Sequence, residues 1–335
     1  MTRLGEPAAL QPESGLAAVL DALAAGTRVS GSVLAGRLGV SRAAVWKHVQ
    51  RLRALGLAIE AGAGRGYRLA APFERLDAAL IRAALADAWL PASVEVHWHL
   101  DSTSSELLRR APRAGTERIA CLAELQGSGR GRRGRAWHTP LGGGLALSLL
   151  QRFDCGMAAL AGLSLVAGVA AAEALADCGI GDIGLKWPND LVANGAKLGG
   201  ILVELGGDAL GPCHAVIGIG LNHRLDAPTR AAIGQPATDL AALANGEPPS
   251  RNRVAARVLA RLGAALDLFA ARGFGAFADA WAARDVLRGQ RVCVLGRDAR
   301  EGVALGVDAR GALRVRLAGG ECAVDSGEVS VRGPA

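Results

Sequence analysis

The chain has 335 residues, of which half are hydrophobic and about a fifth are charged. That composition excludes a disordered chain and leaves room for two or three domains. No run of 18 residues is free of both charges and helix breakers, and the N-terminus lacks the apolar core of a signal peptide. We therefore expect a cytoplasmic protein without a membrane partner. The six cysteines form no C-x-x-C pair, so the sequence predicts no metal site fixed by the protein.

Positive charge is concentrated at the N-terminal end of the chain. The net charge is +7 overall, and residues 1–70 alone hold nine lysines and arginines against four acidic residues. A basic terminal segment indicates a polyanionic partner. Only three of the 38 basic residues are lysines, namely Lys47, Lys186 and Lys197. These positions are candidates for a role that needs a compact ammonium rather than a planar guanidinium.

Residues 15–70 have the pattern of a winged helix-turn-helix. Apolar residues recur at helical spacing over 16–23, a short helix follows at 33–38, and a serine can cap a third, basic helix over 41–53. A Gly-rich turn at 62–66 between two short β segments predicts a wing with a basic tip. The alternative is a plain three-helix protein-interaction domain. The expected DNA-contacting residues are Ser41, Arg42, Lys47, Arg51 and Arg65.

The rest of the chain mixes strand and helix patterns. These patterns do not alternate regularly, which predicts an α+β domain with a mixed sheet. The last fifty residues change to short strands separated by Gly and Asp turns, which predicts a small β-barrel. We therefore predict three domains, with boundaries at 1–72, 73–285 and 286–335.

The segment from Gly129 to Arg135, with sequence GRGRRGR, is the most unusual part of the central domain. Alone, such a run is typical of a nucleic-acid-binding segment. This one is short and lies between apolar segments. A Gly-rich loop can wrap its backbone N–H groups around a phosphate while arginines neutralise the charge. We therefore predict a site for ATP or an acyl adenylate, and we expect this arginine loop (residues 129–135) to become ordered when the anion binds.

Three further motifs surround the arginine loop in sequence. An Asp-Ser-Thr-Ser stretch at 101–104 follows a strand and, alone, is an ordinary helix N-cap. The KWPND motif at 186–190 has the residues of a sharp turn. The Asn194-Gly195 pair is a hairpin signal, and it leads to the prediction that Lys186 and Lys197 lie on neighbouring strands.

Together these motifs carry a resemblance to a known family. The order and spacing of D-S-T at 101–103, E-x-Q at 124–126, the arginine loop, KWPND, K-L-x-G-I-L-V-E at 197–204 and G-I-G-x-N at 218–222 resemble the biotin protein ligases. With the N-terminal domain, the chain is similar to the bifunctional bacterial type that also represses biotin synthesis genes. The resemblance spans about residues 15–335. It implies a central domain like that of the class II synthetases and a C-terminal SH3-like barrel.

The resemblance also implies ligands and partners. The family joins biotin to ATP, giving biotinyl-5′-AMP and pyrophosphate, and then passes biotin to a lysine of a biotin carboxyl carrier protein. Mg²⁺ is expected with the ATP. Operator DNA and a ligand-promoted homodimer are the other partners implied.

Candidate site residues follow from the same motifs. Biotin would contact Ser102, Thr103, Ser104, Gln126, Gly129, Arg130, Gly131, Arg132, Lys197 and Gly200. ATP or the adenylate would contact Arg130, Arg132, Arg133, Arg135, Trp137, Asn189, Asn222, Glu328 and Arg332. The catalytic set is Lys197, Asp190, Lys186 and Arg132, in which cations neutralise phosphate charge and Asp190 is the candidate base for the acceptor amine.

The sequence departs from the family pattern at several positions, and two alternative functions remain. Ser104 stands where the family has asparagine, and Ala136 stands where a lysine is common. One alternative is a biotin-sensing transcription factor without ligase activity, which would not need Lys186, Asp190 and Lys197 together. The other is a ligase for a different acid such as lipoate, against which the arginine loop and the KWPND motif argue.

Overall fold

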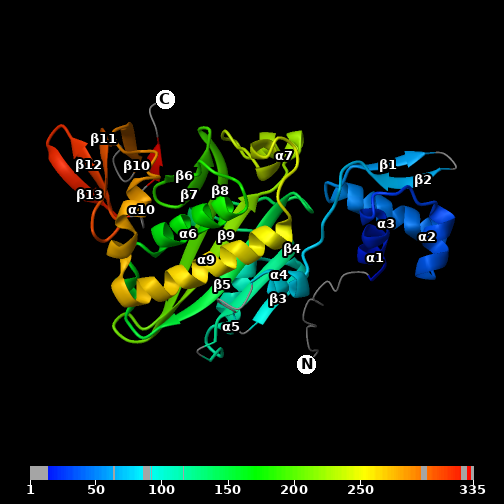
Figure 1. The fold of residues 1–335 in the computed structure, drawn as a ribbon, viewed down its shortest axis with the longest axis horizontal. Coiled ribbons are helices and arrows are strands. Elements are labelled where there is room, and N and C mark those ends of the chain that lie inside the picture. Colours follow the sequence, from blue (N-terminus) through cyan, green and yellow to red (C-terminus); the bar gives the residue numbers. More distant parts are fainter. Residues whose placement is uncertain are drawn as a thin grey trace, which may run out of the picture.

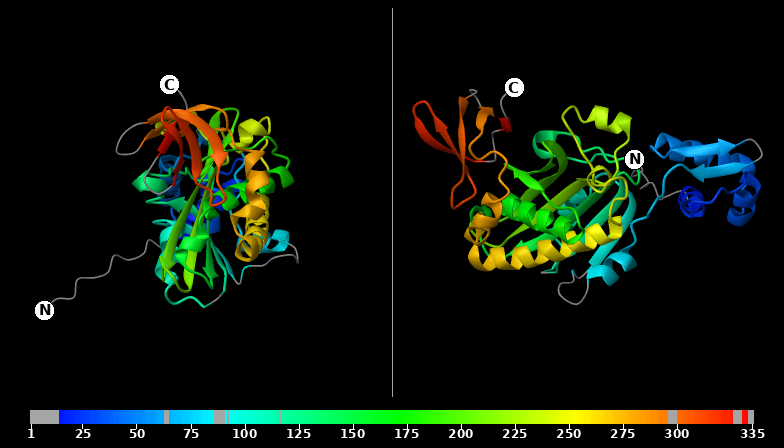
Figure 2. Two further views of the ribbon diagram at one scale, coloured as in Figure 1. Left: turned by 90° about the vertical axis from the view of Figure 1, so that its left-hand side faces the viewer. Right: turned by 45° about the horizontal axis from the view of Figure 1, so that its top comes forward.

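The computed structural model describes residues 14–62, 65–85, 91, 93–115, 117–295, 300–325 and 330–332. The N-terminal helices and a C-terminal β-sheet lie at opposite ends of a larger central domain (Figure 1). Figure 2 shows the same separation from a further side. The architecture is the predicted α+β arrangement, with a mixed sheet at its centre.

The N-terminal unit is a helix-turn-helix with a two-stranded wing. Its elements are α1 (Ser14–Ala24), α2 (Gly31–Leu38), α3 (Arg42–Ala54), β1 (Ile59–Gly62) and β2 (Gly66–Leu69). The Ser41 hydroxyl caps α3 by accepting a hydrogen bond from the Ala44 N–H at 3.1 Å, as predicted. The apolar faces predicted for α1 and α3 are fully buried against one another, so the three helices share one core.

The central sheet has seven strands in the order β3-β4-β5-β9-β8-β7-β6. Only β3 and β4 are parallel, and the other neighbours are antiparallel. The strands are β3 (Ser93–Leu100), β4 (Ile119–Gln126), β5 (Gly144–Phe153), β6 (Gly184–Lys186), β7 (Asp190–Ala193), β8 (Ala196–Gly207) and β9 (Cys213–Asn222).

Helices cover the two faces of this sheet unequally. The main core lies under α4 (Ala78–Leu85), α6 (Leu163–Asp177) and α9 (Arg251–Arg272), and α5 (Thr103–Arg110) packs on the other face. Side chains of β4 alternate between the faces, so Leu122 joins the main core and Cys121 packs with α5. The segment Met157–Asp177 is long and apolar enough to cross a membrane, but 67% of its apolar window is buried, as expected of a core helix.

Short elements complete the central domain. They are the 3-10 turns at Arg132–Gly134, Met157–Leu160 and Phe274–Phe277 and the helices α7 (Ala227–Ala232), α8 (Leu240–Leu243) and α10 (Ala278–Ala282). The predicted hairpin turn at Asn194-Gly195 joins β7 to β8, and both residues have positive φ. The prediction that Lys186 and Lys197 lie on neighbouring strands is wrong, because β7 lies between β6 and β8. The chain reverses at the KWPND motif and forms β7 before the Asn194-Gly195 turn, so one more strand lies between the two lysines than we predicted.

The C-terminal unit is a five-stranded antiparallel sheet in the order β13-β12-β11-β10-β14. Its strands are β10 (Arg291–Leu295), β11 (Arg300–Val307), β12 (Leu313–Leu317), β13 (Gly320–Val324) and β14 (Ser330–Arg332). The buried Trp187 of the KWPND motif, which precedes a cis Pro188, donates its indole N–H to the Gly311 carbonyl at 3.1 Å. One turn of the central domain is thereby fastened to the C-terminal sheet.

Candidate active site and nucleic-acid interface

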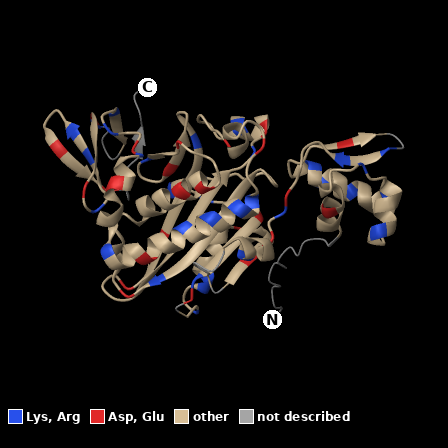
Figure 3. Cartoon of the chain, in the orientation of Figure 1, with Lys and Arg blue, Asp and Glu red and all other residues tan. Residues whose placement is uncertain are grey.

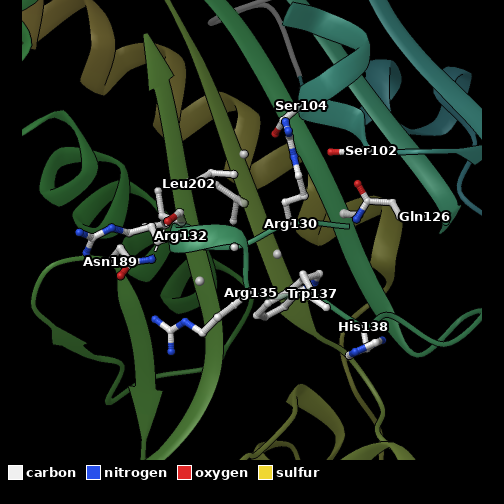
Figure 4. Close-up of a pocket in the computed structure, with 18 of the residues that line it drawn as sticks. Ser102, Ser104, Gln126, Arg130, Arg132, Arg135, Trp137, His138, Asn189 and Leu202 are labelled. Atoms are coloured by element: carbon white, nitrogen blue, oxygen red, sulfur yellow. Dashed lines mark hydrogen bonds between the residues drawn. The ribbon is translucent and has the colours of Figure 1, made fainter. Parts of the chain in front are cut away.

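A cavity of about 440 Å³ opens on the face of the central sheet that carries α5. Its wall is formed by the N-terminus of α5, the arginine loop and strands β5, β8 and β9. In Figure 4, Ser102, Ser104 and Gln126 gather at one side of the cavity, and Arg132 and Asn189 lie at the opposite side. The predicted residues that line it are Ser102, Thr103, Ser104, Gln126, Arg130, Gly131, Arg132, Arg135, Trp137, Asn189, Lys197, Gly200 and Asn222.

The uncharged side of the cavity is built by the start of α5 and the end of β4. Ser102 is the N-cap of α5, and its hydroxyl accepts a hydrogen bond from the Ser105 N–H at 3.4 Å. The Thr103 backbone N–H donates to Gln126 Oε1 at 2.9 Å. A backbone N–H can only donate, so this bond fixes which end of the Gln126 amide is oxygen and which is nitrogen.

Sequence reasoning missed Ser148, which lies at the centre of β5 and is fully buried. Its Oγ is 2.7 Å from Thr103 Oγ1 and 3.0 Å from Ser104 Oγ. We call Thr103, Ser104 and Ser148 the hydroxyl cluster. A signal was present in the sequence, since Ser148 is the only polar residue in the apolar run 145–150.

The arginine loop is folded back on itself by its own backbone. The Gly131 N–H donates to the Arg135 carbonyl at 2.7 Å, and the Trp137 N–H donates to the Gly129 carbonyl at 2.8 Å. Between these bonds Arg133 has a φ of 58°, a left-handed conformation that costs a non-glycine residue free energy. This geometry turns the chain sharply, so Arg132 and Arg135 line the cavity and Arg133 is exposed outside it.

The loop arginines differ in their surroundings. Burial lowers the pKa of Arg132, and the neighbouring positive charges of Arg133 and Arg135 lower it further. The negative charge of Asp190 offsets part of this lowering. Arg130 instead donates to Glu204 on β8, with 3.1 Å between its guanidinium nitrogen and Oε1.

Two glycines on neighbouring strands lie against the Trp137 ring. Gly200 on β8 and Gly220 on β9 are register partners. A Cβ added at Gly220 would lie 2.5 Å from the Trp137 ring, so only glycine lets the ring lie this close to the strand. The position of Trp137 beside the cavity therefore depends on Gly220, whereas a Cβ at Gly200 would only touch the ring at 3.6 Å.

Lys197 and Asp190 form an ion pair at the edge of the cavity. Lys197 Nζ is 2.6 Å from Asp190 Oδ1, and the two side chains are only 14% and 20% exposed. Nζ also lies 5.8 Å from the centre of the Trp137 ring, within reach of a cation–π interaction. The Asn222 amide donates to the Lys197 carbonyl at 3.3 Å and to the Thr238 carbonyl at 3.0 Å. Asn222 thus fixes the backbone that carries the lysine.

Several predicted site residues lie outside the cavity wall. Gly129, Arg133 and Lys186 are not among its lining residues, and Asp190 reaches the site through Lys197. Glu328 lies outside the described residues, and of Arg332 the structure describes only the backbone, in β14. In the part of the chain that is described, no group of three or more His, Cys, Asp and Glu side chains could hold a metal ion.

Basic residues recur along α3 and the wing of the N-terminal unit (Figure 3). Arg42, Lys47 and Arg51 are exposed on α3, and Arg65 is exposed at the wing. Ser41 is the N-cap, with its hydroxyl turned to the backbone of the helix. Trp46 is 54% exposed on the same helix, which is unusual for so large an apolar side chain.

Comparison with known proteins gives the family. Residues 16–68 match an HTH domain, residues 101–222 match the biotin/lipoate A/B protein ligase family, and residues 289–332 match the biotin protein ligase C-terminal domain. The bifunctional ligase/repressor BirA of Escherichia coli is 38% identical over 311 residues, covering 92% of this chain and 95% of the relative. This chain belongs to the biotin protein ligases.

Other biotin protein ligases agree with this assignment. The biotin–[acetyl-CoA-carboxylase] ligase of Paracoccus denitrificans is 36% identical over 239 residues, which cover 68% of this chain and 96% of the relative. The solved structure of the Aquifex aeolicus biotin protein ligase in complex with biotin and ATP is 29% identical and covers 72% of this chain and all of that one, with a TM-score of 0.62. The resemblance predicted from the motifs is confirmed, including the repressor-type helix-turn-helix that this ligase carries.

Proposed function

We propose that the chain activates biotin with ATP to biotinyl-5′-AMP, releasing pyrophosphate, and transfers biotin to a lysine of a biotin carboxyl carrier protein. One observation carries the proposal. A single cavity has uncharged hydrogen-bonding groups from α5 and Gln126 on one side and the cations Arg132 and Lys197 elsewhere on its wall. The uncharged groups can hydrogen-bond the cyclic urea of biotin. The cations can bind the biotin carboxylate and the phosphates of ATP.

In the first step a biotin carboxylate oxygen forms a bond to the α-phosphorus of ATP as the bond to pyrophosphate breaks. The carboxylate is already ionised at neutral pH, so the protein needs to supply positioning and charge neutralisation rather than a strong base. Lys197 and Arg132 are suited to hold the reacting oxygens, with Arg135 near the phosphates. Mg²⁺, expected to enter on the ATP phosphates, would neutralise the leaving pyrophosphate.

In the second step the acceptor lysine attacks the acyl carbon and AMP leaves. An amine with a pKa near ~10.4 must first lose a proton. Asp190 is the carboxylate closest to the cavity cations, because one of its oxygens contacts Lys197. We assign it the deprotonation or orientation of the acceptor amine.

The N-terminal unit extends the proposal to gene regulation. The exposed basic residues of α3 and the wing have the charge expected of a helix that enters the major groove of operator DNA. Two half-sites would require a homodimer, promoted by the bound adenylate. Both proposed activities are consistent with the cytoplasmic location expected from the sequence.

Pyrophosphate release tests the enzymatic proposal. The purified chain should release pyrophosphate from ATP in the presence of biotin, and lipoate should neither replace biotin nor compete with it. Transfer of biotin to an isolated carrier domain tests the second step. Biotin binding without pyrophosphate release would favour a biotin sensor that lacks ligase activity. Pyrophosphate release with lipoate in place of biotin would favour a lipoate ligase.

A gel shift tests the regulatory proposal. DNA from upstream of biotin synthesis genes should bind the full chain more tightly when biotin and ATP are both present. Loss of binding in Arg42→Ala and Lys47→Ala, with pyrophosphate release unchanged, would assign the contact to α3. Binding that is independent of both ligands would contradict control by the adenylate.

A further inference from the structure

The hydroxyl cluster contains one hydroxyl, that of Ser148, which is buried in the sheet behind the other two. Ser148 is fully buried in β5, between Cys121 on β4 and Gly218 on β9. A buried serine costs free energy unless it is hydrogen-bonded, and both of its partners are side chains that line the cavity. Its contacts therefore point to a role in the site rather than in the core.

The distances from the Thr103 hydroxyl to its two neighbouring oxygens bear on which of them receives its hydrogen. Gln126 Oε1 already receives the Thr103 backbone N–H at 2.9 Å, whereas the Thr103 hydroxyl lies 3.3 Å from it. The same hydroxyl is 2.7 Å from Ser148 Oγ, which is the better distance for an O–H···O bond. The Thr103 hydroxyl can donate to either oxygen, and we assign its one hydrogen to Ser148, the nearer of the two acceptors.

The remaining hydrogens follow from counting. Each hydroxyl has a single hydrogen. With Thr103 assigned as the donor, Ser148 receives a hydrogen from Thr103 and gives its own to Ser104, whose Oγ is 3.0 Å away. The Ser104 hydrogen is then left for an acceptor in the cavity. Hydrogen bonds arranged in a chain polarise one another, which strengthens the last donor.

The backbone behind Ser104 prevents its side chain from turning away. A Cβ added at Gly218 would lie 2.6 Å from Ser104 Oγ, so this hydroxyl rests directly against β9. Ser104 is also only 5% exposed. Its hydroxyl is held by packing from β9 and by the hydrogen bond from Ser148.

We infer that Ser148 is a positioning residue for biotin, which acts by making Ser104 a fixed hydrogen-bond donor to the carbonyl oxygen of the ureido ring. The inference rests on the proposed function and adds a specificity determinant to it. Ser148 borders the cavity but is fully buried behind its two partners, so we assign the contact with biotin to Ser104 and not to Ser148. The role of Ser148 is to orient Ser104.

The test uses the full chain and the variants Ser148→Ala, Ser104→Ala and the double variant. Ser148→Ala should weaken biotin binding by about tenfold, the factor expected for one lost oriented hydrogen bond. The KM for ATP at saturating biotin and the melting temperature should stay within error of the wild type. Ser93→Ala, which removes a serine hydroxyl bonded to Glu95 on β3, is the matched control and should bind biotin normally.

Two comparisons separate positioning from a general structural role. In the Ser104→Ala background, the further change Ser148→Ala should alter biotin binding less than twofold, because Ser148 acts through Ser104. With 2-iminobiotin, whose ring carries an imino group in place of the carbonyl oxygen, Ser148→Ala should lose much less affinity than with biotin. Additive losses, or equal losses for both ligands, would overturn the inference.

The outcomes also distinguish this inference from the proposed function. A wild-type chain that neither binds biotin nor releases pyrophosphate would refute both. Wild-type turnover together with unchanged biotin affinity in Ser148→Ala would refute the positioning role alone.

Discussion

At the scale of single residues, the ion pair between Lys197 and Asp190 gives the sharpest test of the chemistry. Asp190→Asn keeps the size of the side chain and removes its negative charge. We expect adenylate formation to fall modestly, by about tenfold, because Lys197 loses a partner 2.6 Å away. Transfer to the carrier lysine should fall at least tenfold further, because no carboxylate then accepts the proton. Single-turnover kinetics of the two half-reactions measure each loss separately.

Asp177→Asn is the matched control for this change. Asp177 forms its ion pair with Arg261 on α9, with 2.8 Å between the charged atoms, and does not line the cavity. Both half-reactions should stay near their wild-type rates in this variant. Equal losses of the two steps in Asp190→Asn would restrict Asp190 to orienting Lys197 and would exclude it as the base.

His223, next to Asn222 at the end of β9, predicts a pH dependence of stability. Burial lowers its pKa from 6.5 to about 4, and its Nε2 hydrogen bond to the Pro249 carbonyl at 2.9 Å opposes that shift only in part. The folded protein keeps the ring neutral, whereas the unfolded chain binds a proton below pH 6.5. His223 therefore reduces the free energy of unfolding as the pH falls from 6.5 towards 4, by up to about 3 kcal/mol.

The variant His223→Gln isolates this contribution. Glutamine can still donate to the Pro249 carbonyl but does not titrate. Urea unfolding at several pH values between 7.5 and 4.5 should show a shallower loss of stability in the variant than in the wild type. Parallel curves for the two proteins would mean that His223 is not the group responsible.

At the scale of secondary structure, Gly220 of β9 positions the aromatic wall of the cavity. In Gly220→Ala the new Cβ would lie 2.5 Å from the Trp137 ring, so the ring must move. We expect kcat/KM for pyrophosphate release to fall by at least about tenfold, with a small change in melting temperature. Gly181→Ala is the control, because a Cβ there meets no atom within 4 Å. Normal activity in Gly220→Ala would show that the position of Trp137 is not needed.

The secondary-structure elements that depend on neighbouring residues could be predicted from the sequence, whereas the order of the strands could not. The capped helices, the wing and the Asn194-Gly195 turn depend on neighbouring residues, so local patterns were sufficient. The order of the strands depends on pairing between distant segments. KWPND therefore looked like a simple turn, although it starts the extra strand β7 and fastens Trp187 to the C-terminal sheet. Ser148 was missed for the same reason, since its partners belong to α5.

At the scale of the whole molecule, a buried ion pair joins parts of the chain that are far apart in sequence. Arg251 at the start of α9 lies 2.8 Å from Glu124 on β4, and both side chains are 1% exposed. Arg251 also donates to the Gly144 carbonyl on β5, and Glu124 accepts the Leu76 N–H. This network connects α9, two strands and the segment before α4, and no local pattern in the sequence indicated it.

Breaking this pair on one side should destabilise the protein strongly. Arg251→Met leaves the Glu124 carboxylate buried without its cation, which typically costs about 3–5 kcal/mol of unfolding free energy. The double variant Arg251→Met/Glu124→Gln should recover part of the loss, because no charge is then left unpaired. Arg291→Met, in an exposed pair with 3.7 Å between the atoms, should have no measurable effect. Chemical denaturation compares the three, and a double variant less stable than Arg251→Met would contradict this explanation.

The N-terminal unit contacts the central domain through a buried leucine and an ion pair. Leu141, which follows the arginine loop, is 3% exposed and belongs to the core of the helix-turn-helix, and its N–H donates to the Leu55 carbonyl at 3.4 Å. Arg75 adds an ion pair to Asp21 at 2.8 Å. Leu141→Ala should weaken the contact by about 2–3 kcal/mol.

The weakened contact should expose the connecting segment 70–77. We expect limited proteolysis there to accelerate at least about tenfold, because the two units separate more often. Leu210→Ala, a leucine that is 92% exposed, should be cleaved at the wild-type rate. Unchanged cleavage in Leu141→Ala would mean that the ion pair of Arg75 and Asp21, rather than the apolar contact, holds the two units together.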